Sequence, residues 1–347
     1  MIKVLIIDDS ASIRAVFRAV LESSPQIIVC GEAADAFEAR SLIKKLQPDV
    51  ITLDIEMPKM DGITFLRNLM RLHPIPTIMI STRTELGSVL SIEALSLGAI
   101  DCIHKPNFND IDQIADEIIS KVLVAAKTHV LNASSIYDDE NPQLEVTGEY
   151  IKDRLIAIGA STGGVPAIEQ VIARLPTNCP PIIMVQHIPE YFAHTFVKRL
   201  DEKYPLNIYL AAEGQTINAG CVYLAPGNHH LEVIKKMGKY HCKLHQAERV
   251  CYHRPSVDIL FNSVAEITNG NASAALLTGM GKDGAAGLLA MKKKGCFTMI
   301  QDEATSLVWG MPKAAAELGA ADKVVPLHHT AHTLLNSCYV NGATYAS

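Results

Sequence analysis

The chain has 347 residues, of which 48% are hydrophobic and 20% charged, and its net charge is -6 at pH 7. This length is large for one hydrophobic core and predicts two domains, while the composition is typical of a soluble globular protein. The charge balance gives no reason to expect nucleic-acid binding, and apolar runs such as Ile182 to Val185 are too short to span a bilayer. The 8 cysteines occur singly, which predicts reduced thiols in a cytoplasmic protein without a structural metal.

The first part of the chain alternates short apolar runs with amphipathic stretches. This alternation predicts a doubly wound α/β domain over residues 1–127, with a last helix from Ile111 to about Lys127. The carboxyl ends of parallel strands meet at one edge of such a sheet. The predicted strands are Val4 to Ile7, Ile27 to Cys30, Val50 to Leu53, Thr77 to Ile80 and Ile100 to His104.

Acidic residues follow two of these strands at that edge. Asp8 and Asp9 come after the first run, and Asp54 comes after the third. Neighbouring carboxylates repel one another unless a hard cation such as Mg²⁺ neutralises them, and oxygen ligands suit that ion. We therefore predict a Mg²⁺ site formed by these three carboxylates and the backbone carbonyl of Glu56.

One oxygen of Asp54 would remain to attack an incoming phosphoryl group. Lys105 follows the fifth run and Ser81 the fourth. Their side chains would pair with and hydrogen-bond the new phosphate. A single Asp at a strand end is more often a cap or turn residue, so the prediction depends on the whole set of residues.

These residues make the first domain resemble a response-regulator receiver domain over residues 1 to about 125. The resemblance implies a five-stranded, flavodoxin-like fold and a histidine kinase as phosphodonor. It implies that Asp54 is the phosphoacceptor, that Asp8 and Asp9 serve the Mg²⁺ site, and that Ser81 and Lys105 contact the phosphate. One position departs from the pattern, because receivers usually carry an aromatic residue three places before the lysine and this chain has Cys102.

The composition changes after the last predicted helix of this domain. Asn132 to Glu149 is rich in Ser, Asn, Asp, Glu, Gly and Pro and shows no apolar period. We therefore predict a mobile linker over residues 128–151 and a second domain over residues 152–347.

The second domain again alternates apolar runs with amphipathic stretches, which predicts another doubly wound, mainly parallel α/β domain. Several short runs follow one another from Ile208 to His245. Turn signals at Pro226-Gly227-Asn228 and Met237-Gly238 separate them, so we predict β-hairpins attached to the parallel sheet.

A glycine-rich turn, Gly159 to Gly164, follows the first apolar run of this domain and precedes a predicted helix. Such a turn can expose Ser161 as a nucleophile, or it can form an anion site in which Ser161 only caps the helix. The rest of the chain favours the nucleophile. His187 ends the next predicted strand, and Asp283 follows another strand that ends at the same edge.

We therefore predict a Ser161-His187-Asp283 triad, in which the histidine is the base and the aspartate orients it. The backbone N–H groups of Thr162 and Met280 are the expected oxyanion donors. Two nearby features have structural alternatives. His253-Arg254-Pro255 either steers an acidic partner or braces a helix start, and Trp309, the single tryptophan, is expected to pack.

Residues 154 to about 345 resemble the catalytic domain of the chemotaxis protein-glutamate methylesterases. The resemblance implies hydrolysis of glutamate γ-methyl esters on chemoreceptors with release of methanol, deamidation of receptor glutamines, and no cofactor for the esterase. With a receiver in front, it implies activity controlled by phosphorylation. The alternative is a phosphorelay-controlled module that binds an anion or a protein without catalysis. Neither function requires membrane insertion, and we expect a monomer.

The segments that carry this resemblance are Gly159 to Gly164, Gln186 to Pro189, Leu224 to Gly227, His253 to Asp258, Gly279 to Gly284, Gln301 to Glu303 and Trp309 to Pro312.

Overall fold

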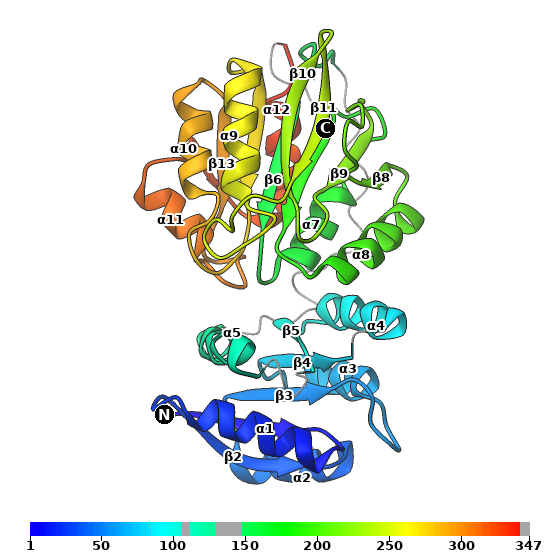
Figure 1. Cartoon of the computed structure of the whole chain (residues 1–347), viewed down its shortest axis with the longest axis vertical. Helices are drawn as coiled ribbons and strands as arrows, with labels where there is room; N and C mark the ends of the chain where they lie inside the picture. The colour runs from blue at the N-terminus through cyan, green and yellow to red at the C-terminus, as the bar shows by residue number, and fades with distance from the viewer. Residues whose placement is uncertain (83, 106–110, 129–147, 341–347) are drawn as a thin grey trace. The chain divides into compact units, whose positions relative to one another are not determined.

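The computed structural model describes residues 1–82, 84–105, 111–128 and 148–340. The chain divides into two compact units, Met1–Tyr137 and Asp138–Ser347, and each has its own sheet (Figure 1). Most of the predicted linker lies outside the described residues. No helix in the described ranges has the length and apolar character needed to cross a membrane. All eight cysteines are free thiols, and six of them are buried.

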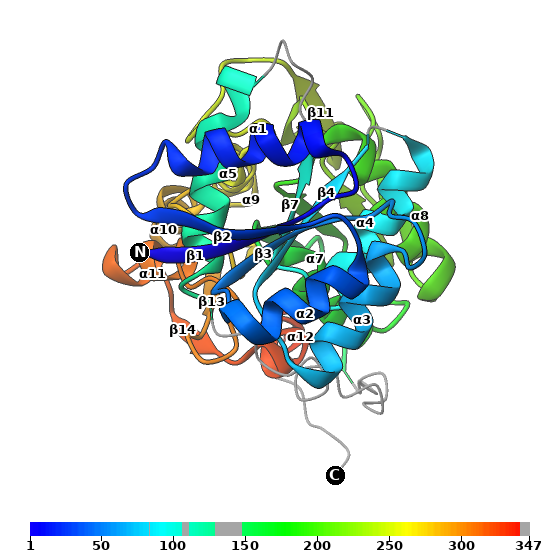
Figure 2. The same cartoon turned by 90° about the horizontal axis from the view of Figure 1, so that it is seen from below.

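The first unit is the predicted α/β domain. Its elements are β1 (Ile2–Ile7), α1 (Ala11–Glu22), β2 (Ile27–Ala33), α2 (Ala36–Leu46), β3 (Val50–Asp54), α3 (Gly62–Leu72), β4 (Thr77–Ser81), α4 (Glu85–Ser96), β5 (Asp101–His104) and α5 (Ile111–Ala125). The five strands are parallel in the order β2-β1-β3-β4-β5. Figure 2 shows α1 and α5 on one face of this sheet and α2 and α3 on the other. Because both faces are covered, the strands are apolar almost throughout.

Local side chains determine where the helices of this unit begin. Ser10, Asp35 and Asp61 precede α1, α2 and α3, and each accepts a hydrogen bond from a backbone N–H of the first turn. Gly62 opens α3 against the end of β3, where an added Cβ would lie 2.0 Å from the backbone oxygen of Asp54. Glycine at this position therefore lets the helix start pack directly on the predicted phosphoacceptor.

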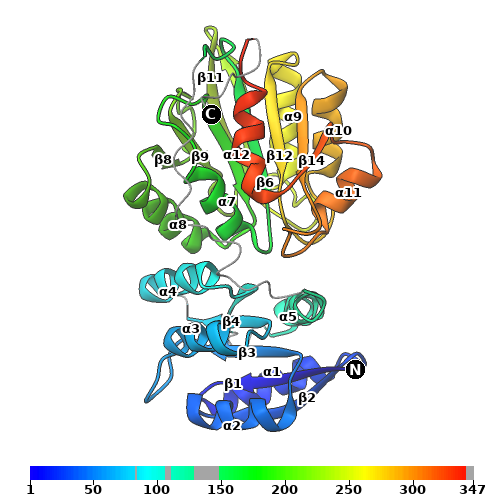
Figure 3. The ribbon, with the colours of Figure 1, turned by 180° about the vertical axis from the view of Figure 1, so that it is seen from behind.

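The second unit is also a three-layer α/β domain. Its strands are β6 (Leu155–Ala160), β7 (Ile182–Gln186), β8 (Asn207–Leu210), β9 (Cys221–Leu224), β10 (His230–Lys236), β11 (Lys239–His245), β12 (Ala272–Leu276), β13 (Phe297–Gln301) and β14 (Lys323–Val325). Its helices are α7 (Gly164–Ile172), α8 (Glu190–Lys203), α9 (Val257–Thr268), α10 (Ala285–Lys293), α11 (Met311–Glu317) and α12 (Leu327–Asn336). Seven parallel strands lie in the order β14-β13-β12-β6-β7-β9-β8. Figures 1 and 3 show α9 and α10 on one face and α7 and α12 on the other.

The prediction of several hairpins in this unit is wrong in part. β10 and β11 do pair antiparallel around Met237 and Gly238, which have φ values of 48° and 79°. However, β8 pairs in parallel with β9, and β9 pairs in parallel with β7, so both belong to the main sheet. The turn at 226–228 connects that sheet to the hairpin. A turn signal marks a change of direction, but it does not identify the strand with which the next run pairs.

Candidate functional site

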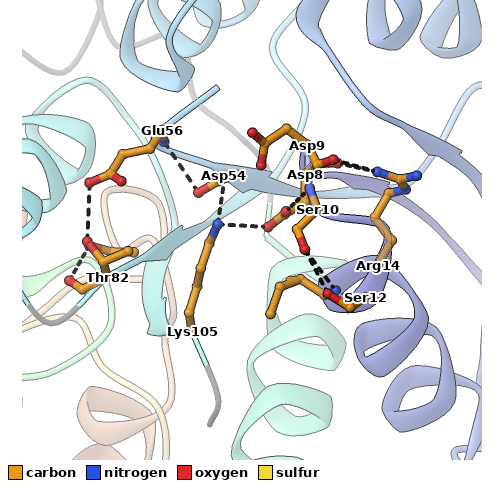
Figure 4. A network of polar contacts seen from close by, with 11 residues as sticks. Asp8, Asp9, Ser10, Ser12, Arg14, Asp54, Glu56, Thr82 and Lys105 are labelled. Carbon is orange, nitrogen blue, oxygen red and sulfur yellow. Dashed lines mark hydrogen bonds and ion pairs between the residues drawn. The ribbon is translucent and has the colours of Figure 1, made fainter. Parts of the chain in front are cut away.

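The three predicted acidic residues of the first unit meet at one edge of its sheet (Figure 4). The register pairs Ile7 of β1 with Leu53 of β3, so Asp8 and Asp54 leave the two strands side by side. One carboxylate oxygen each of Asp8, Asp9 and Asp54 lies within 4.8 Å of the others. Asp8 and Asp54 are both 1% exposed, whereas Asp9 is open to solvent.

Lys105, from the segment after β5, approaches the same carboxylates (Figure 4). Its Nζ lies 2.7 Å from Oδ2 of Asp54 and 3.2 Å from Oδ2 of Asp8. Burial raises the pKa of Asp54 to about 6, and the charge of Asp8 adds to this effect while Lys105 opposes it. Burial alone would lower the pKa of Lys105, but its contacts with the two carboxylates outweigh burial and raise it.

The cluster fits a hard divalent cation. Oδ2 of Asp8 is buried and has the ammonium of Lys105 at 3.2 Å as its ion-pair partner, and carboxylate oxygens are the ligands that Mg²⁺ prefers. The backbone N–H of Glu56 donates to Asp54 at 3.3 Å, which places this residue beside the cluster. Ser81 ends β4 directly after Ile80, the residue that pairs with Asp54, and it is buried.

Cys102 occupies the position where receivers usually have an aromatic side chain. It is 4% exposed, and its Sγ lies 3.6 Å from the backbone oxygen of Ser91. Burial raises the pKa of this thiol to about 12. The residue is therefore a neutral, packed thiol, and it offers no ring that could change rotamer on phosphorylation.

Strand pairing places Ser161 beside His187 in the second unit. Ala160 of β6 pairs with Gln186 of β7, so the next residue of each strand leaves the sheet at the same edge. The backbone N–H of His187 donates to the oxygen of Ala160 at 3.1 Å, and the side chain of Gln186 donates to the oxygen of Ser161 at 2.8 Å. Ser161 is 7% exposed and lies in the turn between β6 and α7.

Asp283 contacts His187 directly, with Oδ2 2.8 Å from Nε2. It is 1% exposed and also accepts hydrogen bonds from the start of α9: Ser256 Oγ at 2.7 Å, Val257 N at 2.7 Å and Asp258 N at 3.0 Å. Burial alone would raise the pKa of Asp283, but these donors and His187 outweigh it and lower the pKa. Asp283 is therefore an anion and acts as the acceptor for Nε2–H of His187.

This contact determines which imidazole nitrogen can act as a base. With Nε2 directed at Asp283, the lone pair is on Nδ1, which is buried and has no hydrogen-bond partner within the described ranges. In the serine-protease triad the carboxylate contacts Nδ1 instead. The imidazole of His187 has the reverse orientation. Among the described residues, Ser161 Oγ forms no hydrogen bond with it, and such bonds often tighten only when substrate binds.

The loop after β12 packs directly against the Ser161 turn. The backbone N–H of Ser161 donates to the oxygen of Thr278 at 3.0 Å, and Thr278 Oγ1 donates to the oxygen of Thr162 at 3.0 Å. A Cβ added to Gly279 would lie 2.8 Å from Cβ of Ser161, so a side chain there would displace the serine. Met280, the next residue, has a backbone N–H with no acceptor in the described part of the chain.

Arg254 and Trp309, the two residues with structural alternatives, both form hydrogen bonds within the protein. Arg254 donates to Asn228 Oδ1 at 2.6 Å and to backbone oxygens of residues 246 and 247, so its guanidinium braces two loops. Trp309 is half-buried and donates from Nε1 to the oxygen of Gln301 at 3.1 Å.

Sequence reasoning missed Ser256, although a serine just before an apolar helical pattern is a typical N-cap. It also missed that the ring of His253 stacks on His187.

His230 supports the helix start that holds Asp283. It is fully buried, its Nδ1 accepts from the backbone N–H of Ser256 at 3.2 Å, and its Nε2 donates to the oxygen of Glu248 at 2.9 Å. This geometry requires a neutral ring, and burial lowers the pKa of His230. An unfolded histidine has a pKa of about 6.5, so below that pH the unfolded state binds more protons. The free energy of unfolding should therefore fall as the pH falls.

We expect the urea midpoint, followed by the fluorescence of Trp309, to decrease from about pH 7 to about pH 5.5. Because the only tryptophan lies in the second unit, its signal reports on that unit. His230→Gln should make the decrease smaller, whereas His229→Gln serves as the control. An equal pH dependence in the wild-type and His230→Gln chains would contradict the prediction.

Comparison with known proteins identifies both units. Residues 156–334 match the family described as CheB methylesterase, and residues 4–118 match the response regulator receiver domain. The chain is 48% identical over 340 residues to "Protein-glutamate methylesterase/protein-glutamine glutaminase 2" of Saccharophagus degradans, which covers 96% of this chain and 98% of that protein. A relative from Hahella chejuensis with the same name, numbered 1, is 47% identical and covers 95% of this chain and 94% of its own.

A solved structure supports the fold of the second unit. The crystal structure of the Thermotoga maritima CheB methylesterase catalytic domain is 36% identical, with a TM-score of 0.52, and it covers 53% of this chain and 98% of that one. The two family models match one unit each, and the similarity to the two relatives covers nearly the whole chain. The chain therefore belongs to the CheB methylesterase family, as a member with an N-terminal receiver domain.

Proposed function

We propose that this protein is a phosphorylation-activated esterase that acts in the cytoplasm. It hydrolyses glutamate γ-methyl esters on chemoreceptors, releases methanol, and deamidates receptor glutamines. The contact of His187 with the buried Asp283, beside Ser161, is the observation that carries this proposal. The names of the relatives, which combine methylesterase and glutaminase, support the same two reactions.

The esterase reaction follows from the charge state of the three residues. Ser161 Oγ attacks the ester carbonyl while Nδ1 of His187 takes its proton, and anionic Asp283 stabilises the imidazolium. The tetrahedral oxyanion lies toward the backbone N–H groups of Thr162 and Met280. When the intermediate collapses, His187 returns the proton to the leaving methoxide and methanol departs.

Hydrolysis of the acyl-enzyme completes the cycle. A water molecule gives a proton to His187 and attacks the acyl carbonyl, and the bond to Ser161 Oγ breaks as the serine regains its proton. The products are a glutamate side chain and free Ser161. With a glutamine substrate the same first step releases ammonia in place of methanol.

The receiver residues have separate roles in the proposed control. Asp54 is the nucleophile toward the phosphoryl group from a histidine kinase. Asp8, Asp9, Asp54 and the Glu56 carbonyl would hold Mg²⁺, which when bound neutralises charge on the incoming phosphoryl group. Lys105, which already lies 2.7 Å from Asp54, pairs with the phosphate oxygens, and Ser81 hydrogen-bonds one of them. Phosphorylation thereby rearranges the contacts at this edge of the sheet.

Methanol release from methylated receptor membranes, with and without a small-molecule phosphodonor, tests this function. The phosphodonor should raise the rate of the wild-type chain about tenfold, a typical coupling between two sites. Asp54→Ala should keep the unstimulated rate, because it lacks the phosphoacceptor. Asp49→Ala is the matched control. Asp49 comes directly before β3, and Asp54 is at the other end of this strand. Stimulation of Asp54→Ala by the phosphodonor would contradict the assigned switch.

A further inference from the structure

A tight turn from Val250 to His253 lies against the candidate triad. The backbone groups of Val250 and His253 exchange two hydrogen bonds, of 3.1 and 2.9 Å, and leave Cys251 and Tyr252 as the central pair. Both central residues have positive φ, 49° and 69°, which a two-residue turn of this kind requires. Such values favour glycine or asparagine over residues with larger side chains, and backbone strain of this kind is concentrated at functional sites.

Both sequence neighbours of Tyr252 approach the triad. The ring of His253 stacks on His187, with centroids 3.8 Å apart and planes inclined by 10°. On the other side, Sγ of Cys251 lies within 4.8 Å of a carboxylate oxygen of Asp283. The backbone of Tyr252 is therefore held between the residues that adjoin the base and its carboxylate.

The side chain of Tyr252 is 91% exposed. It forms no hydrogen bond and no ring contact with any residue that the structure describes. The turn itself is braced, because Arg254 anchors it to Asn228 at 2.6 Å. Packing within the protein thus does not explain why a strained position beside the active site carries a large aromatic residue.

We propose that Tyr252 is a substrate-contacting residue that docks the polypeptide segment carrying the methyl ester. This inference rests on the proposed function and names how that site binds a protein substrate. An ester side chain that reaches Ser161 brings the polypeptide segment that carries it to the edge of the site, where the tyrosine ring can pack on neighbouring apolar side chains of that segment. Tyrosine suits this role because it offers a large, rigid contact area at a small cost in conformational entropy.

Steady-state kinetics of the full, phosphorylated chain on methylated receptor membranes tests the proposal. Tyr252→Ala should raise KM about tenfold and leave kcat unchanged, because the ring contacts the substrate equally in the ground state and in the transition state. Tyr252→Phe should keep the wild-type KM. Tyr209→Ala is the surface control, because Tyr209 is also an exposed tyrosine, at 41%, but lies on strand β8. An unchanged KM for Tyr252→Ala, or a fall in kcat alone, would overturn the proposal.

Tyr252→Gly separates the ring from the turn. Glycine accepts positive φ without strain, so this variant should keep or increase the melting temperature of the second unit and should still lose affinity like Tyr252→Ala. A wild-type KM for Tyr252→Gly would show that turn geometry, and not the ring, determines binding, and would reject the docking role.

Co-sedimentation with methylated receptor membranes gives a readout that does not need turnover. In a Ser161→Ala background, adding Tyr252→Ala should lower the membrane-bound fraction, whereas adding Tyr252→Phe should not. An equal bound fraction in all three chains would reject docking by this residue. If the wild-type chain releases no methanol, the proposed function fails, but this binding comparison still decides the role of Tyr252.

Discussion

Ser161→Ala is expected to stop methanol release from methylated receptors, with turnover at least about a thousandfold below that of the wild-type chain. The alanine side chain has no nucleophile, and neither His187 nor the oxyanion donors can replace one. Ser161 also lies in a tightly packed turn, but losing one oxygen from a residue that is 7% exposed removes little packing. The melting temperature should therefore change little.

The receiver provides an internal control for this variant. Phosphorylation of Asp54 by a small-molecule phosphodonor should proceed as in the wild-type chain, because Ser161 belongs to the other unit. Unchanged methanol release would contradict the triad. It would leave the alternative in which the glycine-rich turn only binds an anion or a protein.

Asp283→Asn should lower turnover about ten-thousandfold, the size of effect known for the same change in a serine protease triad. An asparagine amide that donates to Nε2 of His187 would force the ring proton onto Nδ1. That nitrogen would then lack the lone pair that must accept the proton of Ser161. Initial rates at saturating substrate measure this loss, and KM should change far less than kcat.

Asp258→Asn is the matched control for Asp283→Asn. Asp258 is a half-buried aspartate at the start of α9, and its Oδ1 accepts from the backbone N–H of Gly287 at 2.7 Å. It has no hydrogen bond to His187 within the described residues. Its loss should lower stability with a much smaller effect on turnover. Equal losses of turnover in the two variants would show that the helix start, and not the triad charge, explains the effect.

The fold of both units could be predicted from sequence because it depends on local signals. Alternation of apolar runs with amphipathic stretches requires parallel strands covered by helices, and parallel strands direct their following loops to one edge. That reasoning placed Asp8 and Asp54 together, and it placed Ser161 beside His187. It failed for β8 and β9, because short strands with turn signals between them are compatible with either hairpins or parallel neighbours.

The contacts of Asp283 could not be predicted from the sequence. Its partners lie just after β7 and at the start of α9, which are far from it in the chain. The orientation of the His187 ring, its stacking on His253 and the exposed position of Tyr252 depend on how side chains pack between these elements. No periodicity in the sequence encodes such angles.

The amino-acid sequence alone was sufficient to predict the two α/β domains and to raise two hypotheses, phosphorylation of Asp54 and a Ser161-His187-Asp283 triad, because strand order and loop position follow from short-range patterns. Tertiary structure alone decided that Nε2 of His187 faces Asp283 and leaves Nδ1 without a partner among the described residues, that Ser256 and the start of α9 donate hydrogen bonds to Asp283, and that Tyr252 stands exposed beside the site. These properties depend on burial and on hydrogen bonds between distant segments, which exist only after the chain has folded.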